Sequence, residues 1–176
     1  MARKSNKENI LNCAYKLFCE KGYDNTSMRD IAEEAGVTIG AYFNHYRSKK
    51  TMLVECMKLA QQKNVTVMQK AVRKAIGKPK EEIVDICYKA LKTIKKDALF
   101  VVYTLLTPHL REGIPNIDKR NIWTSEVLSP LFEDIAEDKR ESLIYALFGI
   151  VMAFFYDDNF EMAKTATLDI WMGYIS

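Results

Sequence analysis

The segment between Ser48 and Gly77 consists of 28 consecutive residues without a proline or a glycine. Such a segment favours one long helix, which would extend about 43 Å at about 1.5 Å per residue. Ser48 can cap the start of this helix, and Gly77 and Pro79 can end it. The chain has only 4 prolines and 7 glycines in 176 residues, and the alternation typical of strands is scarce. These observations predict an all-α protein.

Three shorter helices are predicted ahead of the long one. Apolar residues recur at i, i+3, i+4, i+7 and i+8 over about residues 7–21, as on one face of a helix. Ser27, with Asp30 three residues later, resembles a capping box that starts a second helix. Gly36 can supply the positive φ of a tight turn, and Thr38 can cap a third helix. This order predicts a helix-turn-helix unit.

The apolar pattern beyond residue 77 predicts further helices over about residues 80–96, 98–110, 118–137, 138–157 and 161–174. The boundary between the compact three-helix unit and the rest of the chain is expected near Ser48. Residues 1–97 contain 20 lysines and arginines against 11 acidic residues, whereas residues 98–176 contain 6 against 12. The basic part fits a polyanion partner, although a surface of this charge can also be simply solvated.

Several classes of protein are not expected. The four cysteines form no C-x-x-C pair and fall among apolar residues, as reduced core thiols do. Two histidines are too few for a zinc site, and no nucleophile motif or phosphate loop indicates an enzyme. No secretory signal is visible, and the most apolar run, Leu143–Tyr156, is shorter than the roughly 18 residues of a membrane span. We expect a cytoplasmic protein without a metal, another cofactor or a membrane partner.

Residues 8–54 contain a series of spaced positions in a fixed order: Gly22, Thr26-Ser27-Met28, Ile31-Ala32, Ala35-Gly36-Val37-Thr38, Gly40, His45-Tyr46, Ser48-Lys49-Lys50 and Leu53. In these positions the segment resembles the TetR family of transcriptional regulators. The resemblance implies a ligand-responsive repressor that binds a palindromic operator in double-stranded DNA as a homodimer. Residues 1–48 would be the helix-turn-helix DNA-binding domain. Residues 49–176 would be the helical-bundle domain that senses a ligand and dimerises.

The resemblance makes residues 38–46 the recognition helix. Together with the polar residues around it, it predicts a DNA-binding set of Arg3, Lys4, Thr26, Ser27, Arg29, Thr38, Ile39, Gly40, Tyr42, Phe43, His45 and Lys49. One member departs from the family pattern, because Phe43 stands where the family has a tyrosine whose hydroxyl binds a phosphate. The neighbouring tyrosine is Tyr42, one position earlier. His45 is predicted equally well as a phosphate contact and as a surface histidine.

The resemblance also implies an effector pocket between the middle helices. Candidate lining residues are Met57, Tyr88, Phe100, Tyr103, His109 and Trp123, whose aromatic and thioether groups suit an apolar or amphipathic molecule. A plain hydrophobic core explains the same residues. An effector would act by shifting the long helix that links the pocket to the DNA-binding unit.

The run from Leu143 to Phe155 is apolar nearly all round, so a helix there has to be covered on every side. A second copy of the chain would supply that cover. The predicted dimer interface is Ala146, Gly149, Ile150, Ala153, Phe154, Leu168 and Trp171. Two other functions are alternatives for the chain: an enzyme, and a ligand-binding or protein-binding dimer whose DNA-binding unit has decayed.

Overall fold

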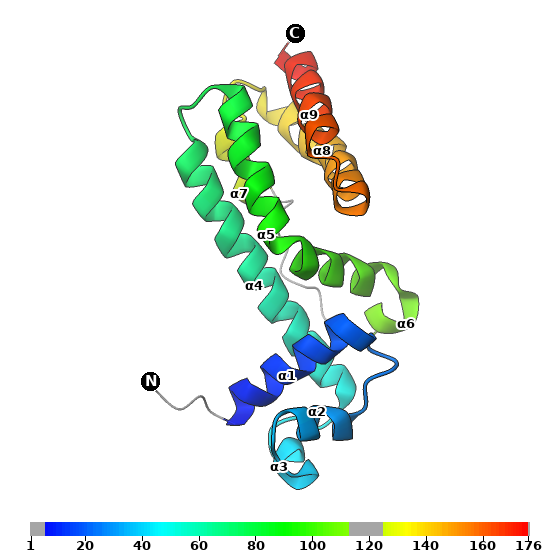
Figure 1. Cartoon of the computed structure of the whole chain (residues 1–176). Coiled ribbons are helices and arrows are strands. Elements are labelled where there is room, and N and C mark those ends of the chain that lie inside the picture. The colour runs from blue at the N-terminus through cyan, green and yellow to red at the C-terminus, as the bar shows by residue number, and fades with distance from the viewer. Residues whose placement is uncertain (1–5, 113–124, 176) are drawn as a thin grey trace.

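A computed structural model describes residues 6–112 and 125–175, and these residues form helices and loops without a strand. The elements are α1 (Asn6–Lys21), α2 (Met28–Glu34), α3 (Ile39–Phe43), α4 (Lys49–Ala75), α5 (Lys80–Leu106), α6 (Pro108–Arg111), α7 (Ser125–Leu128), a 3-10 turn η1 (Ser129–Leu131), α8 (Glu137–Asp157) and α9 (Phe160–Ile175). Figure 1 shows α1, α2 and α3 at one end of the molecule and the α8–α9 pair at the other. The predicted all-α class is confirmed.

The long helix α4 connects the two ends, as its sequence predicts. The Ser48 hydroxyl accepts a hydrogen bond from the backbone N–H of Thr51, and the two hydroxyl oxygens lie 2.9 Å apart. The cap of α4 is therefore a single backbone bond to the Ser48 hydroxyl, together with a contact between the two hydroxyls. Over its second half α4 lies beside α5, which returns in the opposite direction (Figure 1).

Two predicted helix boundaries are wrong. The helices expected over residues 80–96 and 98–110 are one continuous helix, α5, that ends where Pro108 begins α6. No residue between 96 and 98 breaks a helix, and Figure 1 shows that α5 bends in its middle and then runs toward α6. Within the described part of the predicted helix 118–137, only α7 and η1 are helical, because Pro130 lies in the first turn of η1 and the chain leaves the helical conformation after it.

The buried apolar residues form two clusters. The first joins α1, α2, α3 and the first half of α4 to the end of α5 and to α6, with Ile10, Ile31 and Leu53 at its centre. The second joins the remaining halves of α4 and α5 to α7, η1, α8 and α9. Both α4 and α5 therefore pass through both clusters. In the described part of the chain, no helix combines the length and the apolar content that crossing a bilayer requires.

Candidate nucleic-acid interface and ligand cavity

The start of α2 is fixed by a reciprocal cap. The Ser27 hydroxyl oxygen accepts a hydrogen bond from the N–H of Asp30 at 3.1 Å, and the Ser27 N–H donates to the Asp30 carboxylate at 2.7 Å. These bonds to the charged form hold the pKa of Asp30 below its usual value. Aspartate therefore completes the capping box that the sequence predicts, and α2 begins at a fixed residue.

The turn between α2 and α3 depends on Gly36. Its φ is 66°, a left-handed conformation that a side chain disfavours. Its N–H donates to the carbonyl of Glu33, and the N–H of Val37 donates to the carbonyl of Ala32, so the last carbonyls of α2 are satisfied. Val37 is half-buried and packs against the first core cluster. The turn thus sets the direction in which α3 leaves the core.

One side of α3 is exposed and carries no charge. The Thr38 hydroxyl caps the helix by accepting a hydrogen bond from the N–H of Ala41 at 3.2 Å. Ile39 and Phe43, one helical turn apart, are 39% and 45% exposed. A Cβ added to Gly40 would meet only the Thr38 hydroxyl oxygen, at 3.9 Å. Nothing inside the described protein requires a glycine there, which is the pattern expected where another molecule approaches the backbone.

Tyr42 does not share this exposed side, so its predicted DNA contact is wrong. The residue is 0% exposed and packs between helices of the first cluster, with its ring 6.1 Å from that of Tyr46. Its hydroxyl has no hydrogen-bond partner among the described residues. One residue along a helix turns a side chain by about 100°, so when Phe43 faces outward Tyr42 faces the core. Tyr42 cannot replace the hydroxyl that Phe43 lacks.

Thr26 is also buried, and its predicted phosphate contact is wrong. It is 1% exposed, and its hydroxyl donates to the carbonyl of Gly22 at 2.8 Å. Its N–H donates to the carbonyl of Tyr23 at 3.2 Å. Thr26 therefore ties the loop between α1 and α2 to the end of α1. The rest of the predicted set within the described residues is exposed or half-buried, so these contacts stay predictions, whereas Arg3 and Lys4 lie outside the described residues.

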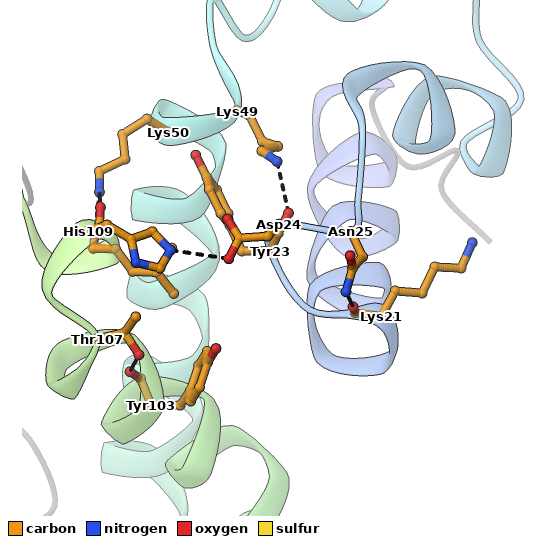
Figure 2. A network of polar contacts seen from close by, with 10 residues as sticks. Lys21, Tyr23, Asp24, Asn25, Lys49, Lys50, Tyr103, Thr107 and His109 are labelled. Carbon is orange, nitrogen blue, oxygen red and sulfur yellow. Dashed lines mark hydrogen bonds and ion pairs between the residues drawn. The ribbon is translucent and has the colours of Figure 1, made fainter.

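Two lysines at the start of α4 bind neighbouring segments of the chain (Figure 2). The Lys49 ammonium donates to the carbonyl of Tyr23 at 2.9 Å and lies 4.2 Å from the centre of its ring. The Lys50 ammonium donates to the carbonyls of Leu110 and His109 at the end of α6. Beside it, His109 and Asp24 form an exposed pair at 3.1 Å. These contacts join α6 to the loop before α2.

Sequence reasoning missed Arg47, which is exposed directly after α3 and Tyr46. Neither Arg47 nor Arg29 has a hydrogen bond or ion pair to another described residue. The signal that could have found Arg47 is its place as the first cation after the recognition helix. Both arginines are therefore available to bind an anion.

A cavity of about 60 Å³ lies inside the second cluster. It is lined by Met68, Ile83, Val84, Cys87, Tyr88, Leu91, Leu128, Leu131, Phe132, Ile144, Leu147, Val151, Thr167 and Trp171. The two hydroxyls among them are bonded to each other, with 2.7 Å between the oxygens of Tyr88 and Thr167. Burial raises the pKa of Cys87 to about 12, which keeps this thiol neutral. The lining is apolar and carries no charge.

Only Tyr88 of the predicted pocket residues lines this cavity. Met57 and Phe100 belong to the first cluster, at the other end of α4 and α5, where they pack near α1. Tyr103 is 57% exposed, and His109 lies on the surface beside Asp24. Trp123 lies outside the described residues. Four of the predicted positions therefore do not face this cavity, because helix periodicity does not tell which turn of a long helix faces which partner.

The predicted dimer interface divides into surface and core. Phe154 and Trp171 are 1% and 2% exposed within one chain, so their prediction as interface residues is wrong. Gly149 and Ala153 are exposed, and Ala146, Ile150 and Leu168 are half-buried. Sequence reasoning missed Tyr145 and Tyr156, which are 74% and 94% exposed on α8. The described residues contain no cluster of histidine, cysteine or carboxylate side chains arranged to hold a metal.

Comparison with known proteins identifies relatives of the N-terminal unit. Residues 10–56 match the family described as bacterial regulatory proteins, TetR family, which are regulators and not enzymes. YerO of Bacillus subtilis, an HTH-type transcriptional regulator, is 30% identical over 77 residues. Those residues are 44% of this chain and 27% of YerO. The chain spans between about a quarter and a half of the length of such relatives.

Solved structures resemble the whole chain. A transcriptional regulator from Rhodococcus sp. Rha1 has a TM-score of 0.74 at 19% identity, covering 98% of this chain and 99% of that one. The multidrug binding protein EbrR in complex with malachite green has a TM-score of 0.69 at 18% identity, covering 95% of this chain and 98% of EbrR. At these identities the likeness establishes the fold, an N-terminal helix-turn-helix followed by a helical domain.

Proposed function

We propose that the chain, whose residues 10–56 match the TetR family of bacterial regulatory proteins, is a transcriptional repressor that binds a palindromic operator as a homodimer and responds to a small molecule. The observation that carries the proposal is the exposed side of α3, where Ile39, Gly40 and Phe43 have no role in the core. A short helix held against a fixed α2 and open on its far side has the geometry that enters a major groove.

Cations around α3 support a nucleic-acid partner. Arg29 and Arg47 have no partner among the described residues, and Lys49 is held at the start of α4 by Tyr23. Ammonium and guanidinium groups in such positions bind phosphates and fix the orientation of a helix in the groove. Two of the three acidic residues of α2 are already engaged, Asp30 in the cap and Glu34 with Lys16 at 2.7 Å.

A homodimer through α8 and α9 accounts for the apolar surface that one chain leaves uncovered. Tyr145, Gly149, Ala153 and Tyr156 follow one another along one exposed side of α8. Glycine and alanine at that spacing allow a second helix to approach closely, and the flanking tyrosines would cover the contact. A two-fold axis through this side would present two α3 helices to the two halves of an inverted repeat.

The cavity supports a small, neutral and apolar effector. Its lining offers no charged side chain, and its two hydroxyls already bond to each other, so a charged ligand would lose hydration without meeting an opposite charge. EbrR, which shares the fold, is described with malachite green and with ethidium bound. Both dyes are cations, so EbrR supports the binding of a small molecule by this fold, whereas the neutral charge is inferred from the lining of this cavity alone. Met68 on α4 and Leu91 on α5 line the cavity, and the same two helices reach the first cluster. An effector that moves them would change the distance between the two α3 helices.

The deciding experiment is selection of bound duplexes from a random DNA pool at about 150 mM salt, where non-specific phosphate binding is weakened. We expect an enriched inverted repeat. Gly40→Glu places a carboxylate on the open side of α3 and should abolish enrichment without unfolding the protein. The matched control is Gln69→Glu, which adds the same charge at an exposed position of α4. Folded protein that enriches no sequence, or a Gly40→Glu variant that still enriches one, would contradict the proposal.

A further inference from the structure

The exposed side of α3 is apolar where a DNA-reading surface is usually polar. Ile39 and Phe43 are separated by one helical turn, so they lie on the same side of the helix. Neither residue belongs to the two core clusters. The Phe43 ring packs edge-on against Tyr42, with 5.5 Å between the ring centres, which restricts where it can lie. Two apolar side chains are thus held outward on the element that would enter the groove.

Base edges in the major groove carry hydrogen-bond donors and acceptors, with one apolar group, the 5-methyl of thymine. An isoleucine or phenylalanine set against a polar edge removes water from that edge and returns no hydrogen bond. Set against the thymine methyl, the same side chain buries apolar surface on both molecules. The two side chains therefore favour thymine at the positions they cover.

Resting on the proposed DNA-binding function, we propose that Ile39 and Phe43 read thymine 5-methyl groups in each half of the operator. Gly40 between them adds no side chain, so the helix backbone can come close enough for this contact. Arg29 on α2 and Arg47 directly after α3 are exposed in the same helix-turn-helix unit and supply the charge that holds a polyanion against it. This assigns to Phe43 a role in base recognition that needs no hydroxyl.

The test replaces thymine by deoxyuridine in the selected operator, one symmetric pair of positions at a time. Uracil keeps the hydrogen-bonding groups of thymine and lacks only the methyl. We expect at least one pair at which the dissociation constant rises about fourfold for each methyl removed, which is the burial of one methyl group converted to affinity. Replacement of thymines outside the two half-sites should leave the constant unchanged.

Protein variants assign the effect to its side chains. Phe43→Ala and Ile39→Ala should each weaken binding to the thymine operator, and the double variant should bind the thymine and uracil operators equally. Ile76→Ala is the matched control, because Ile76 is a 53% exposed apolar residue at the far end of α4. Helix content by circular dichroism should be unchanged in all three single variants.

The outcomes separate this inference from the proposed function. An enriched operator that contains no thymine in its half-sites, or that binds equally with uracil at every position, overturns the role of the methyl groups and leaves the repressor intact. A methyl effect that persists in the double variant overturns the assignment to Ile39 and Phe43. Failure to enrich any operator overturns the proposed function, and this inference with it.

Discussion

The Tyr15 hydroxyl on α1 donates a hydrogen bond to the carboxylate of Asp97 on α5. The Lys63 ammonium on α4 lies 3.7 Å from the same carboxylate and 4.6 Å from the centre of the Tyr15 ring. The Tyr15 ring also packs against the Phe100 ring, with 5.2 Å between the two ring centres. Three helices therefore meet at one group of polar and aromatic contacts, where the two core clusters adjoin.

Tyr15→Phe removes this hydrogen bond and keeps the ring packed edge-to-face against Phe100. Because the acceptor is a largely buried carboxylate, we expect the free energy of unfolding in urea to fall by about 1.5–3 kcal/mol. Tyr103→Phe is the control, since Tyr103 is 57% exposed and should change stability by less than about 0.5 kcal/mol. Equal stability of the two variants would show that Lys63 alone satisfies Asp97.

Tyr42→Phe tests the correction that the structure makes to the DNA-binding set. The Tyr42 hydroxyl is buried without a partner among the described residues, so its removal should leave stability unchanged or raise it by about 1 kcal/mol. Operator affinity, measured by fluorescence anisotropy, should stay within about twofold of the wild type, which is less than about 0.5 kcal/mol. A tenfold loss of operator affinity in a stable variant would show that the Tyr42 hydroxyl contributes to DNA binding.

The same residue predicts a dependence of stability on alkaline pH. Burial raises the pKa of Tyr42 to about 12 in the folded protein, whereas a tyrosine in the unfolded chain titrates near 10. The folded state therefore holds more protons between these values, and the free energy of unfolding falls as the pH rises from about 10 to 12. Below pH 10 this contribution is fully present.

Tyr42→Phe should make that decline shallower by at most about 1.4 kcal/mol per pH unit, the effect of one proton. Urea titrations of both proteins at intervals from pH 8.5 to 12 measure the difference. Part of the decline should remain in the variant, because burial also raises the pKa of Tyr46 to about 12. Identical slopes would mean that Tyr42 ionises as readily in the folded protein as in the unfolded chain.

The helix-turn-helix could be predicted from the sequence because local hydrogen bonds specify it. The hydroxyls of Ser27, Thr38 and Ser48 each cap the helix that follows, and Gly36 takes a positive φ in the turn. Every one of these contacts joins residues within three positions of each other. The core of this unit follows from the same local pattern, since the apolar positions of α1 repeat at helical spacing.

Features that depend on distant residues could not be predicted. Tyr42 and Phe43 are neighbouring aromatic residues, and only the packing of α3 on the core decides which one is buried. The cavity is lined from α4, α5, α7, η1, α8 and α9, which no single stretch of sequence brings together. Asp97 interrupts the apolar pattern of α5 without breaking the helix, and its contacts with Tyr15 and Lys63 join residues that lie far apart in the sequence.

Gly149→Arg should separate the proposed dimer into folded single chains. A Cβ at Gly149 meets no atom within 4 Å in the protomer, so the arginine fits one chain alone, and arginine favours a helix over glycine by nearly 1 kcal/mol. Against a second α8 the same side chain would be buried without a partner. We expect half the molecular mass in ultracentrifugation at about 10 µM and operator affinity reduced at least about 100-fold, because the half-sites would bind separately.

Gln69→Arg adds the same charge at an exposed position of α4 and should keep the wild-type mass. Thermal unfolding separates dissociation from misfolding, since the Gly149→Arg chain should retain its helix content and unfold cooperatively. The melting temperature of the wild type should rise with protein concentration, because folding of a dimer is coupled to association. The melting temperature of the variant should not depend on protein concentration. A Gly149→Arg protein that stays dimeric would place the contact on a different side of the molecule and leave Tyr145 and Tyr156 without the cover proposed for them.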